Sequence, residues 1–144
     1  MHVWPWVVTA IVILYVLGQW LMLRPTPQEQ HRMKLREAAK DLGFQVRLRK
    51  APDWLVGAPI VVAYYALASE RVGLLPRRDW RTAQGDWLGI PPGVAPENPD
   101  WSAWRDRLLG WERDQHAVIF FWTEHANVQD LPALKRLGLA VLQL

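Results

Sequence analysis

The sequence contains no cysteine and only two serines, Ser69 and Ser102. Without cysteine there are no disulfides, no thiolate nucleophiles and no cysteine-ligated metal sites. Neither serine lies in the Gly-x-Ser-x-Gly turn that presents a hydrolase nucleophile. A catalytic pair of carboxylates, such as Asp53 with Asp86, stays an open alternative, because sequence alone does not show whether two side chains lie close together. We therefore assign no catalytic residue, no metal ligand and no cofactor.

Histidine is also scarce, and the most suggestive group of titratable residues is His116, Glu124 and His125. A strand over residues 117–123 would hold His116 and Glu124 at its opposite ends. If the strand continued through residue 125, Glu124 and His125 would point to opposite faces. We therefore predict no metal site here, because metal ligands must converge within coordination distance.

Charge is absent from the first 23 residues, which hold no Asp, Glu, Lys or Arg. The run 3–23 is 21 residues long. At about 1.5 Å per residue, a helix of this length reaches across the roughly 30 Å core of a bilayer. We predict a transmembrane anchor over residues 1–23. Its expected membrane-interface residues are Trp4, Trp6, Trp20 and Arg24.

Two alternatives compete with a retained anchor. A buried core helix of this length would be apolar all round, and the rest of this short chain offers little to cover it. A cleaved signal peptide needs a basic n-region, an apolar core of roughly 7 to 15 residues and a small-x-small cleavage site. None of these three features is found in the sequence, so we expect the helix to stay attached.

The charges that flank the span predict its orientation. Before it lies only His2 with the amino terminus, whereas five basic residues follow it by residue 40. Lysine and arginine resist translocation, so they mark the cytoplasmic side. We predict a single-pass protein of a bacterial-type inner (plasma) membrane, with its N-terminus outside and its C-terminal domain in the cytoplasm.

The segment that follows the span is strongly basic. Residues 24–50 carry eight basic and three acidic side chains, a net of +5, whereas residues 51–144 carry nine basic and eleven acidic, a net of −2. Such a cluster attracts anionic lipid by up to about 1 kcal/mol per residue. The alternative is that these charges only set topology and solvate one helix face. The candidate lipid-headgroup residues are Arg32, Lys34, Arg36 and Lys40.

Local patterns predict the first elements after the span. Prolines break the helix at residues 24–28, and Thr26 then caps a new helix over residues 27–42 that ends at Gly43. Residues 44–49 alternate apolar and polar, which is typical of a strand with one exposed face. Its two arginines, Arg47 and Arg49, are not part of a nucleic-acid-binding motif, so we expect no nucleic-acid partner.

The remaining chain predicts a single α+β domain over residues 29–144. Apolar runs indicate central strands at 60–67 and 117–123, with a hairpin at 80–88 and a proline-rich loop at 90–99 between them. We also predict a helix over 100–112, and a βαβ unit made of strand 117–123, a helix over 130–137 and a strand over 139–143. The expected fold is two-layered: a mixed sheet of about five or six strands packed with about three helices.

Tryptophan is unusually frequent, with ten residues in the chain. On the predicted helix over 100–112, Trp101, Trp104 and Trp111 share one face. This stripe is either the core contact of the helix or an exposed anchor, since Trp and Arg are enriched at binding hot spots. The candidate partner-binding residues are Trp101, Trp104, Trp111 and Arg105.

These features favour a membrane-anchored accessory or adaptor protein whose partners are the lipid bilayer and a second protein near the membrane. The alternative is a membrane-anchored, hydrolase-like enzyme whose site is assembled from residues distant in the sequence. A third hypothesis is a lipid-surface sensor that uses residues 24–50. A deep pocket that collects Asp, Glu or His would favour the enzyme, and a flat face with exposed Trp and Arg would favour the adaptor.

Overall fold

The structure is a computed structural model that describes residues 2–55, 57–71 and 73–143. The chain divides into two compact units, Met1–Arg32 and Met33–Leu144, and the boundary falls inside a helix. The first unit contains α1 (Trp4–Met22), which has no buried residue and is long and apolar enough to cross a membrane. A signal sequence near the N-terminus has the same properties, so α1 is compatible with an anchor and with a signal sequence.

The second helix, α2 (Pro27–Asp41), begins and ends as the sequence predicts. The Glu29 backbone N–H donates to Thr26 Oγ1, and the Thr26 N–H donates to Glu29 Oε2, each at 3.2 Å. These two bonds form a capping box, which satisfies N–H groups that the helix itself leaves unpaired. Gly43 ends the helix with a φ of +99°, a backbone conformation that glycine adopts without a Cβ clash.

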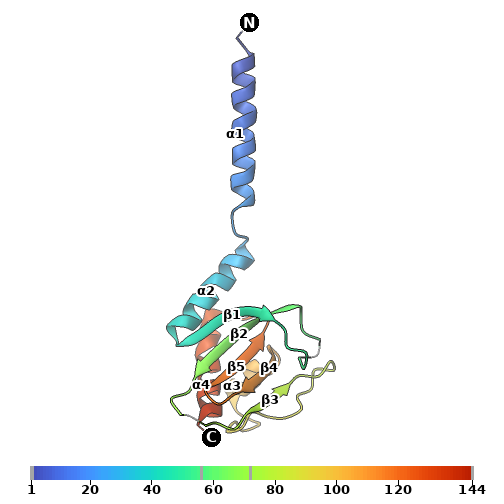
Figure 1. Cartoon of the computed structure of the whole chain (residues 1–144), viewed down its shortest axis with the longest axis vertical. Coiled ribbons are helices and arrows are strands. Elements are labelled where there is room, and N and C mark those ends of the chain that lie inside the picture. Colours follow the sequence, from blue (N-terminus) through green and yellow to red (C-terminus); the bar gives the residue numbers. More distant parts are fainter. Residues whose placement is uncertain (1, 56, 72, 144) are drawn as a thin grey trace. The chain divides into compact units, whose positions relative to one another are not determined.

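The second unit is an α+β domain built on a five-stranded sheet, in the order β1-β2-β5-β4-β3 (Figure 1). Every neighbouring pair of strands is antiparallel, so the predicted mixed sheet is wrong. The strands predicted at 44–49, 60–67 and 117–123 are confirmed. The strands are β1 (Phe44–Lys50), β2 (Val61–Ala68), β3 (Arg77–Trp80), β4 (Leu108–Arg113) and β5 (Ala117–Trp122).

The predicted helix over 100–112 is wrong beyond its first turns. Helix α3 spans only Pro99–Trp104, with the Asn98 side chain accepting hydrogen bonds at its N-cap, and the chain then enters β4. The tryptophan spacing that resembles a helical stripe therefore belongs to two elements. Gly110 lies where β4 shifts register against β5, and a Cβ there would lie 2.6 Å from Leu55 Cδ1.

The predicted strand over 139–143, and with it the βαβ unit, is also wrong. Helix α4 (Leu131–Leu142) runs through this region after a short 3-10 turn, η1 (Val128–Asp130). Gly138 is interior to α4, where a Cβ would lie 2.9 Å from Leu67 Cδ2. It is thus a site of close packing against the sheet, and the helix continues past residue 137, where the sequence pattern predicts that it ends.

The hairpin predicted at 80–88 is present in reduced form. Arg81 and Trp87 form one isolated antiparallel bridge, and Gly85, with a φ of +88°, lies in the turn between them. The proline-rich stretch that follows is a loop, as predicted, and leads into α3.

The two faces of the sheet bury different sets of side chains. On the face we call the covered face, Tyr65, Phe120 and Trp122 pack with apolar residues of α2, α3 and α4. On the opposite face, a smaller buried cluster contains Leu55, Val62, Ala66, Ile119 and Phe121, and among the described residues none from a helix contributes to it. We call this second face the open face, because within the described part of the chain it is covered by the loop that contains Trp54 and Leu55 and by no helix.

Candidate functional site

The tryptophans singled out by the sequence are buried in the domain. Trp101 is 4% exposed, and Trp104 and Trp111 are 0% exposed. Trp104 packs edge-to-face against Trp122 with ring centroids 4.9 Å apart, and its indole N–H donates to the Asp130 carbonyl. The exposed-anchor interpretation of these three rings is therefore wrong. All three are core residues, although Trp111 reaches the core from β4 and not from a helix. Arg105 is exposed at the C-terminal end of α3.

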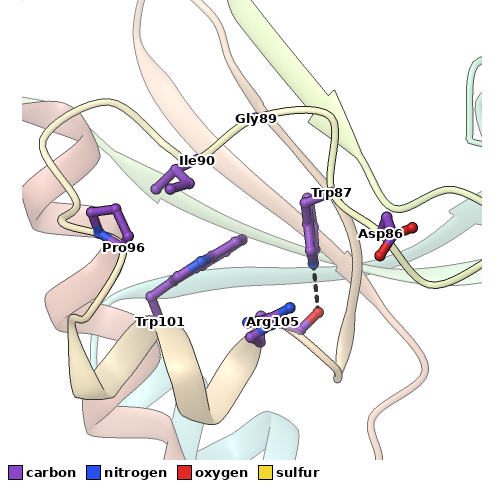
Figure 2. Close-up of a pocket in the computed structure, with 7 residues that line it drawn as sticks. All are labelled: Asp86, Trp87, Gly89, Ile90, Pro96, Trp101 and Arg105. Carbon is purple, nitrogen blue, oxygen red and sulfur yellow. Dashed lines mark hydrogen bonds between the residues drawn. The ribbon is translucent and has the colours of Figure 1, made fainter.

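One edge of Trp101 contributes to a surface pocket of about 420 Å³ (Figure 2). Trp87 and Trp101 form its indole walls, with ring centroids 5.0 Å apart and planes tilted by 65°. The Trp87 indole N–H donates to the Arg105 carbonyl at 2.7 Å, which fixes the ring. Ile90 and Pro96 face these rings, and among the described lining residues the only ionisable groups are Asp86 and Arg105. The pocket can accept an apolar group, and it lacks a pair of carboxylates.

Aromatic side chains also gather on the open face. The Trp54 ring lies edge-on to Phe121 at 5.4 Å and tilted against Trp80 at 6.0 Å. Tyr64 contacts Phe121 from the other side, with ring centroids 5.7 Å apart. Unlike Trp104, the rings of Trp54, Trp80 and Tyr64 are only partly buried, so each presents part of its surface to solvent.

Two arginines lie over these rings. The Arg49 guanidinium carbon is 5.1 Å from the centre of the Tyr64 ring, and that of Arg78 is 5.4 Å from the centre of the Trp54 ring. Cation–π contacts of this kind restrict a guanidinium without neutralising it. Burial raises the pKa of the Tyr64 hydroxyl, and Arg49 partly opposes that rise. Tyr64 is therefore neutral at physiological pH, and the face keeps its arginine charge.

The basic side chains of β1 extend this surface. Gln45, Arg47 and Arg49 stand on the open face, because they pair with Ala66, Tyr64 and Val62 of β2. Arg47, Arg49 and Lys50 are exposed, and in the described part of the chain none of them forms a salt bridge. We define the cationic–aromatic surface as Arg47, Arg49, Tyr64, Trp54, Trp80 and Arg78.

Sequence reasoning identified part of this surface. The alternation over 44–49 correctly predicts that Arg47 and Arg49 share an exposed face. Nothing in the sequence marks Trp54, which lies in a loop, or Tyr64, which lies in a continuous apolar run without alternation. The contacts of Trp54 depend on its loop folding back against Phe121 and Trp80, whereas Tyr64 meets Phe121 as its cross-strand partner in β5. Residue spacing alone indicates neither contact.

The predicted lipid-headgroup residues divide into two groups. Lys34 and Lys40 are exposed on α2, and Arg32 is half-buried. Arg36 instead donates from Nε and Nη2 to the two carboxylate oxygens of Glu124, at 2.8 and 2.6 Å. The hydrogen bond to Glu124 raises the pKa of the Arg36 guanidinium. Arg36 is thus bound within the domain by Glu124, and contact with lipid headgroups stays a prediction for the other three residues.

Glu124 is a buried carboxylate held by contacts from two other elements. It is 5% exposed, and the Tyr65 hydroxyl donates to its Oε2 at 2.9 Å. Burial, followed by the nearby Glu124 charge, raises the pKa of that hydroxyl. Glu124 also has a φ of +63°, a conformation that costs free energy for any residue with a Cβ. Three elements, α2, β2 and the end of β5, are joined at this carboxylate.

The predicted membrane-interface residues all lie in the first unit and are exposed. Trp4 and Trp6 are in the first turn of α1, and Trp20 is in its last turn. The Arg24 guanidinium carbon lies 4.6 Å from the centre of the Trp20 ring. An indole and a guanidinium paired in this way suit a water–lipid boundary, where one side of the pair is apolar and the other is wet.

Comparison of the chain with protein-family models, with curated proteins and with solved structures found no match in any of the three. The functional conclusion therefore depends on the geometry of the described residues.

Proposed function

We propose that this chain is a single-pass membrane protein whose domain acts as an adaptor, binding a second protein beside the bilayer. In this proposal α1 is the anchor in a bacterial-type inner membrane, with the N-terminus outside and the domain in the cytoplasm. The charge-free span and the basic residues that follow it support this orientation. Only a few residues separate α1 from α2, so the tether between membrane and domain is short.

The observation that carries the proposed function is the cationic–aromatic surface. Partly exposed Trp and Tyr rings with arginines held over them are the side-chain types that dominate protein-binding hot spots. The strands of the sheet hold most of these groups, so little conformational entropy is lost when a partner binds. Since Arg47 and Arg49 form no salt bridge in the described part of the chain, the expected partner surface is acidic.

The adaptor is preferred over the hydrolase-like enzyme because of what the Trp87–Trp101 pocket contains. Its described lining offers one carboxylate and one guanidinium, both at exposed residues. General acid–base hydrolysis needs two groups with pKa values driven apart by burial or by each other. The pocket instead has the character of a small apolar binding site.

Photocrosslinking in intact cells tests the adaptor function. A photoreactive amino acid at Gln45, which is exposed beside the cationic–aromatic surface, should yield one dominant protein adduct. The matched control places the same probe at Gln129, which is exposed on η1. The Gln45 adduct should disappear when Arg49→Glu is added. Equal adducts from both positions, or adducts with lipid alone, would contradict the adaptor function.

The topology is tested separately, and the lack of native cysteine makes the test simple. Single-cysteine variants His2→Cys and Gln143→Cys are exposed to a membrane-impermeant thiol reagent in spheroplasts. We expect labelling of residue 2 before lysis and of residue 143 only after lysis. The opposite pattern would reverse the orientation, and loss of residue 2 from the mature chain would identify α1 as a cleaved signal.

A further inference from the structure

Strand β1 is an edge strand whose outer side is open. It pairs with β2 alone, over the whole of Phe44–Lys50, and no other described strand lies beside it. Along this strand the side chains of residues 47–50 are all exposed. An open edge of this length offers unpaired backbone donors and acceptors to another extended chain.

The hydrogen-bonding register shows which backbone groups point outward. The Ala51 N–H donates to the Ile60 carbonyl at 2.9 Å, and these two residues continue the β1–β2 register. Antiparallel partners alternate between hydrogen-bonded and non-hydrogen-bonded pairs, so Arg47 and Arg49 direct their backbone groups toward β2. The residues that direct their N–H and C=O groups outward are Val46, Leu48 and Lys50.

The side chains of β1 disfavour pairing with a second copy of the same strand. An antiparallel pair of β1 edges centred on Leu48 would place Arg47 of each copy opposite Arg49 of the other. Like charges directly opposite each other destabilise a strand pair, and natural edge strands use basic residues to prevent such self-association. The same charges favour a strand of opposite sign, so they select a partner as well as exclude a copy.

The two faces of β1 specify the chemistry of the added strand. On the open face, Arg47 and Arg49 would lie beside the partner's alternate residues, and Arg49 is already restricted by its contact with Tyr64. On the opposite face, Leu48 is 52% exposed and offers an apolar neighbour to the residue between them. The complementary segment is therefore extended, with acidic residues at alternate positions and apolar residues between them.

We infer that the outer edge of β1 binds an extended acid–apolar–acid segment of the partner protein as a sixth, antiparallel or parallel, strand of the sheet. This inference rests on the proposed adaptor function and names the chemistry of its partner. Backbone bonds to Val46, Leu48 and Lys50 supply affinity, and the charges of Arg47 and Arg49 supply specificity.

The test uses the full-length protein in nanodiscs of zwitterionic lipid and a fluorescent peptide of alternating Glu and Val. A peptide of the same composition with its glutamates in one block is the sequence control. We expect the block peptide to bind about tenfold more weakly, because it cannot place a carboxylate opposite both arginines. A third peptide carries N-methyl groups on the backbone amides that would donate to β1. It should not bind, because those amides can no longer form hydrogen bonds with the strand edge. The strand inference is overturned if the alternating and block peptides bind equally.

Charge reversal separates strand addition from general attraction. Arg49→Glu should weaken binding of the Glu–Val peptide and permit binding of a Lys–Val peptide. Arg105→Glu makes the same charge change at an exposed site outside β1 and should have neither effect. Circular dichroism of both variants checks that the fold is retained. If the two variants respond alike, the attraction depends on net charge and the inference is overturned.

Amide exchange identifies the edge directly. In the free protein the amides of Arg47 and Arg49 should exchange slowly and those of Val46, Leu48 and Lys50 quickly; the peptide should protect the second set. Binding without this protection overturns strand addition in favour of docking on the open face. If no peptide binds but Gln45 still captures a protein in cells, strand addition fails while the adaptor function stands. If Gln45 captures nothing either, both fail.

Discussion

The two faces of the sheet use tryptophan in opposite ways. On the covered face, Trp104 and Trp122 are fully buried and pack edge-to-face between the helices and the strands. On the open face, Trp54 and Trp80 are partly exposed, and an arginine lies over Trp54. The abundance of one residue type therefore does not define its role. Depth of burial separates the rings that stabilise the domain from those available to a partner.

The largest expected effect is on the covered face. Trp104→Ala should lower the free energy of unfolding by about 3–5 kcal/mol, because it leaves a large cavity and frees the Asp130 carbonyl from its indole donor. Trp54→Ala, on the open face, should cost less than half as much. Denaturant unfolding of both variants in detergent, followed by circular dichroism, checks this. Equal losses would remove the distinction between the faces.

The buried carboxylate gives the next largest effect. Glu124→Gln removes the charge that pairs with Arg36 and should cost about 2–3 kcal/mol, below the cost for a fully buried pair because Arg36 is partly exposed. Tyr65→Phe keeps the ion pair and removes one hydrogen bond, so it should cost about 1 kcal/mol. Denaturant unfolding measures both. A Tyr65→Phe loss larger than that of Glu124→Gln would show that the ion pair is not the main connection.

The same substitution, glycine to alanine, can be made on each face of the sheet to test how tightly that face is packed. A Cβ at Gly110 would meet Leu55, the Asp79 carbonyl oxygen at 3.1 Å and Trp54, so backbone limits any relief. Gly110→Ala should therefore cost about 1–3 kcal/mol and displace the loop from the open face. Gly138→Ala meets only side chains and gains about 1 kcal/mol of helix propensity, so its net effect should be near zero. Thermal unfolding checks the order, and a reversed order would contradict this account.

The smallest expected effect depends on pH. Burial raises the pKa of the Asp79 carboxyl, and its Oδ2 has no hydrogen-bond partner among the described residues. The folded domain therefore disfavours the charged form. This penalty is absent below the ordinary pKa of 3.8 and is complete above the raised one. Asp79→Asn should stabilise the domain at pH 7 by less than about 1 kcal/mol and not at pH 3. Exposed Asp53→Asn is the control; stabilisation by Asp79→Asn at both pH values would contradict the assignment.

Sequence patterns predicted the elements whose signals are local. The capping box at Thr26, the stop at Gly43 and the alternation over 44–49 all depend on neighbours along the chain, and all three are confirmed. The apolar runs also identified β2 and β5. These features need no knowledge of tertiary packing.

The failures have a common physical cause. The helical spacing of Trp101, Trp104 and Trp111 is a coincidence. The first two lie in the short helix α3 and the third lies in strand β4, and each element buries its own tryptophans. Gly138 looks like a helix end in sequence, but it is kept for close packing of α4 against Leu67 and Phe120. Both depend on contacts between distant residues. The open face was missed for the same reason, since Trp54 acquires its neighbours only when its loop folds back.

The attachment of α2 to the sheet has a mechanical consequence. If α1 is held in a membrane, any pull on the chain reaches the domain through α2, before it reaches a strand. The contacts that hold this helix to the domain are the buried side chains of Leu35 and Ala39 and the bidentate ion pair of Arg36 with Glu124. Load on that helix would therefore strain these contacts first, and loss of the Arg36–Glu124 ion pair would weaken the attachment of α2 to the sheet.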